Sequence, residues 1–305
     1  MGSSFRAAVF AAALTSLPTL VDAGAPPDSS RVGGLAIPVD QAYGFVGFPE
    51  GDVFGTLVAD PKAVESFASD LRGTSESALG TDLASVGIGD RLPLARWGGP
   101  RRGEGLQIGL EAGVFAQFDL NRPSFDLVNQ DYVVGLPVTF RHGAFSNRLR
   151  IYHQSSHLGD EFLLRARIQR ENFAFESLEE IVSWDFAFVR AYGGGELVFN
   201  EQPEGVATSL AHAGIELRPL APLLRLGRNA DLDFLAGVDA KATSALDWHP
   251  GVSARAGFEI ANSAESGHVT RRWAVLAEYY DGPSPYGQFF RSDVTSYGVG
   301  LHFAP

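Results

Sequence analysis

Residues 106–118, LQIGLEAGVFAQF, alternate strictly between two kinds of side chain. Every even-numbered position from Leu106 to Phe118 is apolar, and the odd-numbered positions are mostly Gly, Gln and Glu. A period of two indicates a β-strand with two unlike faces. The stretch is long, because a strand of a globular protein usually has about 5–6 residues. A strand of this length can cross a bilayer when it is tilted.

The same alternation recurs through most of the chain. A soluble β-sandwich also alternates, but three features favour strands that face lipid. The segments are long, their polar faces carry Gly and charges of both signs, and aromatic residues lie near strand ends. Those aromatic residues are Trp248, Trp273, Tyr279, Tyr280 and Tyr297. In lipid the sheet must close, since each unpaired edge group costs several kcal/mol.

We therefore predict an all-β fold: a transmembrane, antiparallel, up-and-down β-barrel of about twelve strands, of the bacterial outer-membrane type. A barrel of this size is narrow, and we expect side chains to fill it. The predicted strands are 62–72, 82–97, 104–119, 130–142, 145–157, 172–189, 191–200, 206–218, 230–243, 247–260, 270–281 and 290–303. If both chain ends are periplasmic, the strand 145–157 runs outward and the segment after it faces the cell exterior.

Composition excludes several classes of protein. The 305 residues carry a formal charge of −12 and contain no cysteine. Disulfide scaffolds and thiolate metal sites are therefore excluded, and an acidic chain without a basic run argues against a nucleic-acid partner. An apolar content of 45% is too high for a disordered chain.

The amino-terminal 60 residues differ from the rest. Residues 1–23 have the pattern of a secretory signal peptide, with Arg6 before a short apolar run and Ala23 at the cleavage position. A membrane anchor is the alternative, but about fifteen apolar residues fall short of the roughly 20 needed to span. Residues 24–60 are rich in Pro and Gly and are predicted to form a periplasmic or plug-like segment. Residues 61–305 form the predicted barrel.

The last strand resembles the final strand of bacterial outer-membrane barrels. From Ser296 to Phe303 it combines a polar residue, glycines, alternating apolar residues and a near-terminal Phe, although Ala304 and Pro305 follow. The resemblance implies a location in the outer membrane and recognition by the outer-membrane assembly machinery.

One stretch carries the candidate chemistry: residues 148–161, RLRIYHQSSHLGDE. Alternation places His153 and Ser155 together on the lipid side. Activation of a serine needs a base within reach and a third group to orient that base. The next predicted strand offers Asn172 and Glu176, and both lie on the same lipid-side face.

The triplet His153-Gln154-Ser155 resembles the active-site strand of outer-membrane phospholipase A and the His-x-Ser of outer-membrane lipid A deacylases. Ser156 and His157 stand where the phospholipase has Asn and Gly. The resemblance implies a lipid-ester hydrolase at the outer rim, with Ser155 as nucleophile, His153 as base and Asn172 or Glu176 as its partner. Phospholipid or lipopolysaccharide would be the substrate.

Simpler interpretations stand beside these. His153 and Ser155 can form an interfacial hydrogen-bonded pair in a non-enzymatic barrel, which would be a narrow channel, a lipid-handling protein or a structural protein. Asp160 and Glu161 suggest a calcium site, or else a solvated loop tip, or ion pairs with Arg165 and Arg167. The stretch from Tyr279 to Gly282 suggests an aromatic girdle and a turn, or else a sugar-stacking platform. We expect Arg148 and Arg150 to join Glu111, Asp131 and Asp185 in an internal ion-pair network, and a pore-lining selectivity site is the alternative.

A wider resemblance covers most of the chain. It is similar to the bacterial family catalogued as domain of unknown function 1207, a family of outer-membrane barrels. The resemblance rests on the stretches 48–49, 57–61, 131–132, 152–161, 192–195, 279–282 and 286–289. It supports the predicted fold and leaves the two candidate functions open.

Overall fold

The computed structural model describes residues 31–32, 35–36, 44–73, 81–99, 101, 103–167, 170–204, 209–227, 230–262 and 272–304. The predicted signal peptide, residues 1–23, lies outside the described residues, as does most of the segment 24–43.

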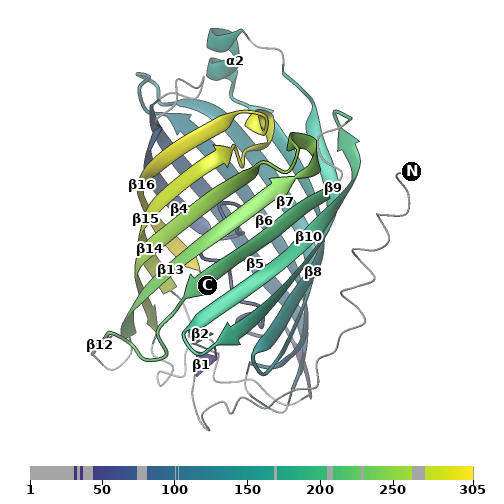
Figure 1. Cartoon of the computed structure of the whole chain (residues 1–305), viewed down its shortest axis with the longest axis vertical. Coiled ribbons are helices and arrows are strands. Elements are labelled where there is room, and N and C mark those ends of the chain that lie inside the picture. The colour runs from purple at the N-terminus through teal and green to yellow at the C-terminus, as the bar shows by residue number, and fades with distance from the viewer. Residues whose placement is uncertain are drawn as a thin grey trace.

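Twelve long antiparallel strands close into a barrel in the described part of the chain (Figure 1). Each pairs with its neighbour in the chain order, and the pairings β16–β4 and β11–β13 close the ring. The predicted fold is therefore confirmed. The strands are β4 (Ser66–Gly73), β5 (Asp82–Gly98), β6 (Gly105–Asp119), β7 (Asp126–His142), β8 (Phe145–Leu158), β9 (Phe173–Phe186), β10 (Val189–Gln202), β11 (Ser209–Leu217), β13 (Ala230–Thr243), β14 (Pro250–Asn262), β15 (Arg272–Pro283) and β16 (Asp293–Ala304).

Short elements complete the described chain. β1 (Arg31–Val32) pairs with β2 (Leu35–Ala36), β3 (Gly44–Gly47) with β5, and β12 (Leu224–Leu226) with β13. Two 3₁₀ turns, η1 (Ser244–Leu246) and η3 (Gly287–Phe289), and the helix α2 (Asp160–Ala166) lie in connections between strands. None of the helices in the described ranges is long and apolar enough to span a membrane.

The helix α2 marks one end of the barrel (Figure 1), which we call the α2 end. β8 runs toward this end, and the strands after it alternate in direction. The connections β8–β9, β13–β14 and β15–β16 therefore all lie at the α2 end. The carboxyl terminus and the two-residue turn Gly143-Ala144 lie at the opposite end.

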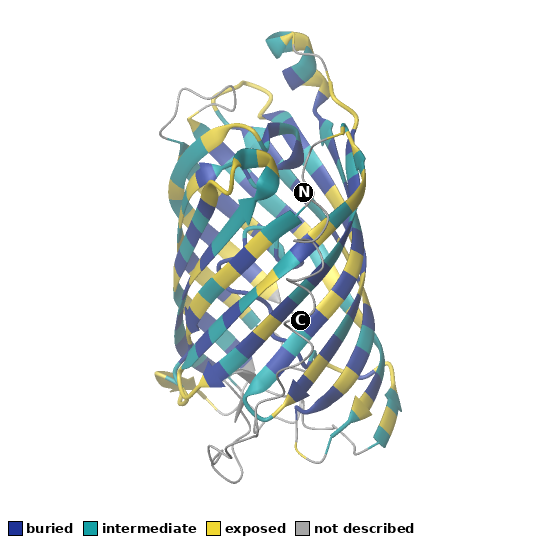
Figure 2. Cartoon of the chain, turned by 45° about the vertical axis from the view of Figure 1, so that its right-hand side comes forward, coloured by how far each residue is buried: buried dark blue, intermediate teal, exposed yellow. Residues whose placement is uncertain are grey.

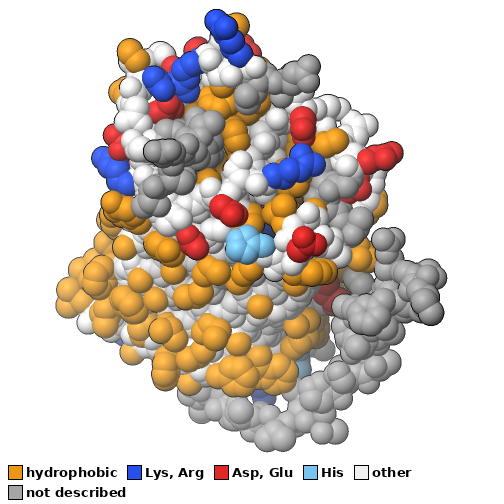
Figure 3. All heavy atoms as spheres, turned by 45° about the horizontal axis from the view of Figure 1, so that its top comes forward, with side chains coloured by type: hydrophobic (Ala, Val, Ile, Leu, Met, Phe, Trp, Pro, Cys, Tyr) orange, Lys and Arg blue, Asp and Glu red, His pale blue; other side chains and the backbone are white. Residues whose placement is uncertain are grey.

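The wall of the barrel is apolar outside and polar inside. Along β8, Leu149 and Ile151 are exposed, while Arg150 and Tyr152 are buried. Buried and exposed residues alternate along the strands (Figure 2). Hydrophobic side chains cover the wall, and charged side chains gather around the α2 end (Figure 3).

The aromatic girdle forms in part. Trp248, Trp273, Tyr279 and Tyr297 are exposed, between 43% and 53%. The prediction that Tyr280 belongs to this girdle is wrong. Tyr280 follows Tyr279 directly in β15, so its side chain points to the opposite face, into the lumen.

Residues 53–60 of the amino-terminal segment lie inside the lumen and occupy part of it. Residues 53–60 are all buried. Arginines from different strands donate to their carbonyl groups: Arg141 Nε to Val53 O at 2.8 Å, and Arg190 Nη1 to Gly55 O at 3.0 Å. The Val58 N–H donates to Glu216 Oε1 at 2.7 Å. These bonds satisfy the backbone of a segment that has no strand partner there.

Ion pairs occupy much of the remaining lumen. Arg150 pairs with Glu111 at 2.6 Å and with Glu179 at 2.7 Å, and Arg148 pairs with Glu179 at 2.8 Å. The pairing predicted between these arginines and Glu111 is confirmed for Arg150, and Glu179, which was not predicted, joins both arginines. Two members differ in their partners, because Asp131 pairs with Lys62 and Asp185 pairs with Arg141.

Candidate functional site

His153 and Ser155 lie on the outer wall of β8, toward the α2 end. Both are half-buried, and the His153 side chain is 42% exposed. The residues between and beside them, Tyr152, Gln154 and Ser156, are buried in the lumen. The side chains of this stretch therefore alternate between the membrane-facing wall and the lumen, as the period of two of a β-strand requires.

The His153 ring is held by a carboxylate of the next strand. Its Nδ1 lies 3.0 Å from Glu176 Oε1, and the two residues are direct partners in the β8–β9 register. An ionised carboxylate only accepts hydrogen bonds, so a neutral His153 carries its proton on Nδ1 and leaves Nε2 free to act as a base. No hydrogen bond joins His153 to Ser155 among the described side chains.

The structure separates the two candidate partners of His153. Asn172 lies one residue before β9 begins, and its Nδ2 donates to Gln202 Oε1 at 2.5 Å. The residue directly opposite Ser155 is Ala174. Glu176, rather than Asn172, thus contacts the imidazole.

The surroundings of this group are apolar. On β7, Tyr132 lies opposite Ser155 and Val134 opposite His153, and their exposed fractions are 40% and 47%. In the described structure, the second carboxylate oxygen of Glu176 is buried without a partner. A polar group of this kind on a lipid-facing wall is unfavourable and is usually functional.

A second polar cluster lies on the luminal side of the same strand. The Ser156 hydroxyl donates to Asn129 Oδ1 at 3.0 Å and also contacts Asp131. Asp131 Oδ2 accepts from Lys62 Nζ at 2.5 Å and from the Gly287 N–H at 3.1 Å. The cluster fixes β8 against the β15–β16 connection.

Stretches that resemble the unknown-function family converge at this cluster, from 131–132, 152–161 and 286–289. The Gln288 N–H donates to Ser156 Oγ at 3.2 Å, across 132 residues of sequence. Burial raises the pKa of the Tyr286 phenol above its ordinary value, so its hydroxyl stays protonated beside Ser85. Sequence reasoning missed this cluster because no local pattern records such distant contacts.

The candidate calcium ligands lie apart from this group. Asp160 and Glu161 occupy the first turn of α2 and are exposed. No three His, Cys, Asp or Glu residues form a metal-binding group within the described ranges. Pairing of these acids with Arg165 is wrong, since Arg165 reaches back to Asp119 at 3.2 Å and to Asp126 at 3.0 Å.

Several solved structures share this fold. Outer membrane phospholipase A from Escherichia coli has 11% identity and a TM-score of 0.53, over 80% of this chain and 92% of that one. An active-site mutant of the same enzyme has 11% sequence identity and a TM-score of 0.55, and the match covers 83% of this chain and 93% of that one. The Salmonella typhi outer membrane phospholipase, a dimer with bound calcium, has 10% sequence identity and a TM-score of 0.53. The match covers 80% of this chain and 93% of that one. The protein thus has a β-barrel fold of the bacterial outer-membrane type, similar to that of outer membrane phospholipase A.

A protein-family model identifies the family to which the chain belongs. The model described as "Protein of unknown function (DUF1207)" matches residues 37–304, and the chain belongs to this family. The family resemblance expected from the sequence is confirmed. No curated protein matches the sequence.

Proposed function

We propose that the protein hydrolyses acyl esters of outer-membrane lipids, with Ser155 as nucleophile, His153 as general base and Glu176 as the group that orients the imidazole. The observation that carries this proposal is the 3.0 Å contact between His153 Nδ1 and Glu176 Oε1 on the membrane-facing wall. It supplies a base and its orienting group beside a serine, which is the arrangement of a serine hydrolase.

The proposed reaction has two steps. Ser155 Oγ attacks the acyl carbonyl carbon while His153 Nε2 takes the hydroxyl proton, and that proton then goes to the departing alcohol oxygen. This step leaves an acyl ester on Ser155. Water, deprotonated by His153, attacks that ester and releases the fatty acid, and the proton returns to Ser155. Glu176 keeps the Nδ1 proton in place and stabilises the imidazolium in both steps.

The position of the group supports a substrate that arrives from within the membrane. His153 and Ser155 lie among exposed apolar side chains, toward the α2 end of β8. Ala174, the partner of Ser155 across the β8–β9 ladder, has a small side chain that leaves room for an acyl ester. If the α2 end faces the cell exterior, the substrate lies in the outer leaflet.

Release of fatty acid tests the proposal. The full chain, purified and placed in lipid nanodiscs, is incubated with phosphatidylethanolamine or with lipopolysaccharide, and released fatty acids are quantified. We expect release by the native protein and none above background by Ser155→Ala. Equal release by both proteins overturns the assignment. Parallel reactions with calcium and with a chelator test the proposed calcium site at Asp160 and Glu161.

Export and assembly belong to the same proposal. Residues 1–23 would direct export, and the strand from Ser296 to Phe303 would be recognised by the outer-membrane assembly machinery. The support is the sequence pattern at both ends of the chain together with the barrel fold.

A further inference from the structure

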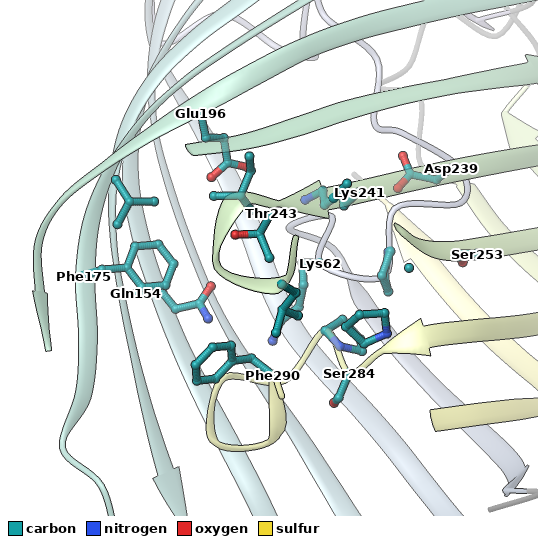
Figure 4. A pocket seen from close by; sticks show the side chains of 18 of the residues that line it. Lys62, Gln154, Phe175, Glu196, Asp239, Lys241, Thr243, Ser253, Ser284 and Phe290 are labelled. Atoms are coloured by element: carbon teal, nitrogen blue, oxygen red, sulfur yellow. The ribbon is translucent and has the colours of Figure 1, made fainter. Parts of the chain in front are cut away.

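The lumen contains a cavity of about 160 Å³ near the α2 end, lined in part by Pro61 and Lys62, which follow the luminal segment 53–60 (Figure 4). One water needs roughly 10–15 Å³ of such space, so the cavity has room for about ten non-hydrogen atoms. Its lining reaches His249, whose side chain is 57% exposed at the α2 end. The cavity is therefore large enough for a small ligand, and its wall extends to the barrel rim.

Three side chains of this cavity have polar groups that the described protein leaves without adequate partners. Gln154 is 8% exposed and Ser253 is 4% exposed, and no described group forms a hydrogen bond with either side chain. The Lys241 ammonium has a single ion pair, with Asp60 at 3.4 Å. A buried polar group without a partner is unfavourable, so these groups point to a ligand or to water that a ligand displaces.

Each of the two carboxylates that line the cavity accepts hydrogen bonds through only one of its oxygens in the described structure. Glu196 Oε2 accepts from the hydroxyl groups of Tyr152 and Ser177, and Asp239 Oδ2 accepts from Tyr192 and from His212. Within the described structure, their second oxygens accept no hydrogen bond. The cavity thus presents free donors and free acceptors together.

Aromatic rings form another part of the wall. Phe175 and Phe290 lie on one side in Figure 4, and Tyr280 also lines the cavity. The Tyr280 hydroxyl donates to the carbonyl oxygen of Pro283, which holds the ring in place. Any side chain at Gly251 would collide with this hydroxyl, so the glycine makes room for it.

We propose that this cavity binds a neutral sugar residue. Sugar hydroxyl groups both donate and accept, as Lys241, Gln154 and the carboxylates require, and the C–H face of a sugar ring packs on aromatic rings. A charged ligand fits less well, because the lining carries both signs: Lys62, Arg150 and Lys241 would repel a cation, and Glu196 and Asp239 would repel an anion. The size of the cavity matches about one hexose ring.

This binding site is independent of the proposed hydrolase. Gln154 projects into the lumen, whereas its neighbours His153 and Ser155 lie on the lipid side of the same strand. The barrel wall separates the two sites, so failure of one leaves the other standing.

Titration with defined sugars tests the inference. The full chain in nanodiscs is titrated with the methyl glycosides of glucose, galactose and N-acetylglucosamine and with maltose, followed by calorimetry and saturation-transfer NMR. We expect saturable binding of at least one of these neutral sugars. Gln154→Leu and Lys241→Met should each weaken that binding at least tenfold, and Glu180→Gln, on the lipid side, should leave it unchanged.

Three results overturn the inference: no saturable binding of any neutral sugar, equal binding by Gln154→Leu, or tighter binding of glucuronate or glucosamine than of the neutral sugars. Gln154→Leu removes an amide that has no partner in the described structure, so this variant should fold. Its heat-modifiable mobility in electrophoresis verifies the folded barrel even if Lys241→Met fails to assemble.

Discussion

His153 Nδ1 and Glu176 Oε1 lie 3.0 Å apart on the lipid-facing wall, although the two residues are 23 positions apart in the chain. They meet because β8 and β9 pair in a register that sets them directly opposite each other. On the same strand, Gln154 and Ser156, the residues that follow His153 and Ser155, face the lumen instead. Neighbouring residues of β8 therefore lie in two separate environments, the lipid and the lumen. We expect variants at adjacent positions to have different effects.

Glu176→Gln should lower the rate of ester hydrolysis by about 10²–10⁴-fold, because a carboxamide cannot hold the His153 tautomer or stabilise the imidazolium. Fatty-acid release in nanodiscs measures the rate. Glu180→Gln is the matched control, since Glu180 lies on the same face of β9 and contacts Asn147 rather than His153. A similar loss in both variants would contradict the role of Glu176.

Ser155→Ala and Ser156→Ala should have opposite effects. Ser156→Ala removes a buried hydroxyl that bonds to Asn129 and Asp131, and should lower the free energy of unfolding by about 1–3 kcal/mol. Ser155→Ala should leave stability unchanged and abolish hydrolysis. Urea unfolding in lipid vesicles, followed by tryptophan fluorescence, measures the first effect. A stable Ser156→Ala protein would show that the luminal cluster contributes little.

Glu179→Ala should be strongly destabilising. The Glu179 carboxylate is fully buried and accepts from both Arg148 and Arg150, so its removal leaves two buried guanidinium groups with fewer partners. Loss of one member of such a network costs about 3–5 kcal/mol. Glu180→Ala, the next residue on the lipid side, should cost much less in the same urea experiment. Coincident unfolding curves for the two variants would refute this account.

Phe303→Ser should reduce the amount of folded barrel in cells, if the last strand is the signal for assembly. Phe303 is 47% exposed on the lipid face of β16, so its loss removes little buried surface. Phe258→Ser, at a similarly exposed position on β14, serves as the control. The folded fraction is measured in membranes by heat-modifiable electrophoretic mobility. Equal yields from the two variants would argue against a signal at Phe303.

The sequence alone determined the strands and their faces. A period of two is a local steric property of an extended chain, so it predicted the lipid-facing side of residues 106–118 and of His153. The same rule placed Asn172 and Glu176 on one face but could not choose between them, because both have the same parity. Tyr280 was misplaced for another reason: its aromatic ring suggested the girdle, although the period of two places its side chain on the luminal face.

Only the tertiary structure decided which side chains meet. The β8–β9 register selected Glu176 for His153 and left Asn172 beside Gln202. Contacts across the lumen brought Gly287 to Asp131 and the 53–60 segment to the strand arginines. Such contacts join residues from 23 to 156 positions apart, and they depend on ring closure and packing rather than on neighbouring residues. For that reason the cavity around Gln154, Lys241 and Tyr280 has no signature in the linear sequence.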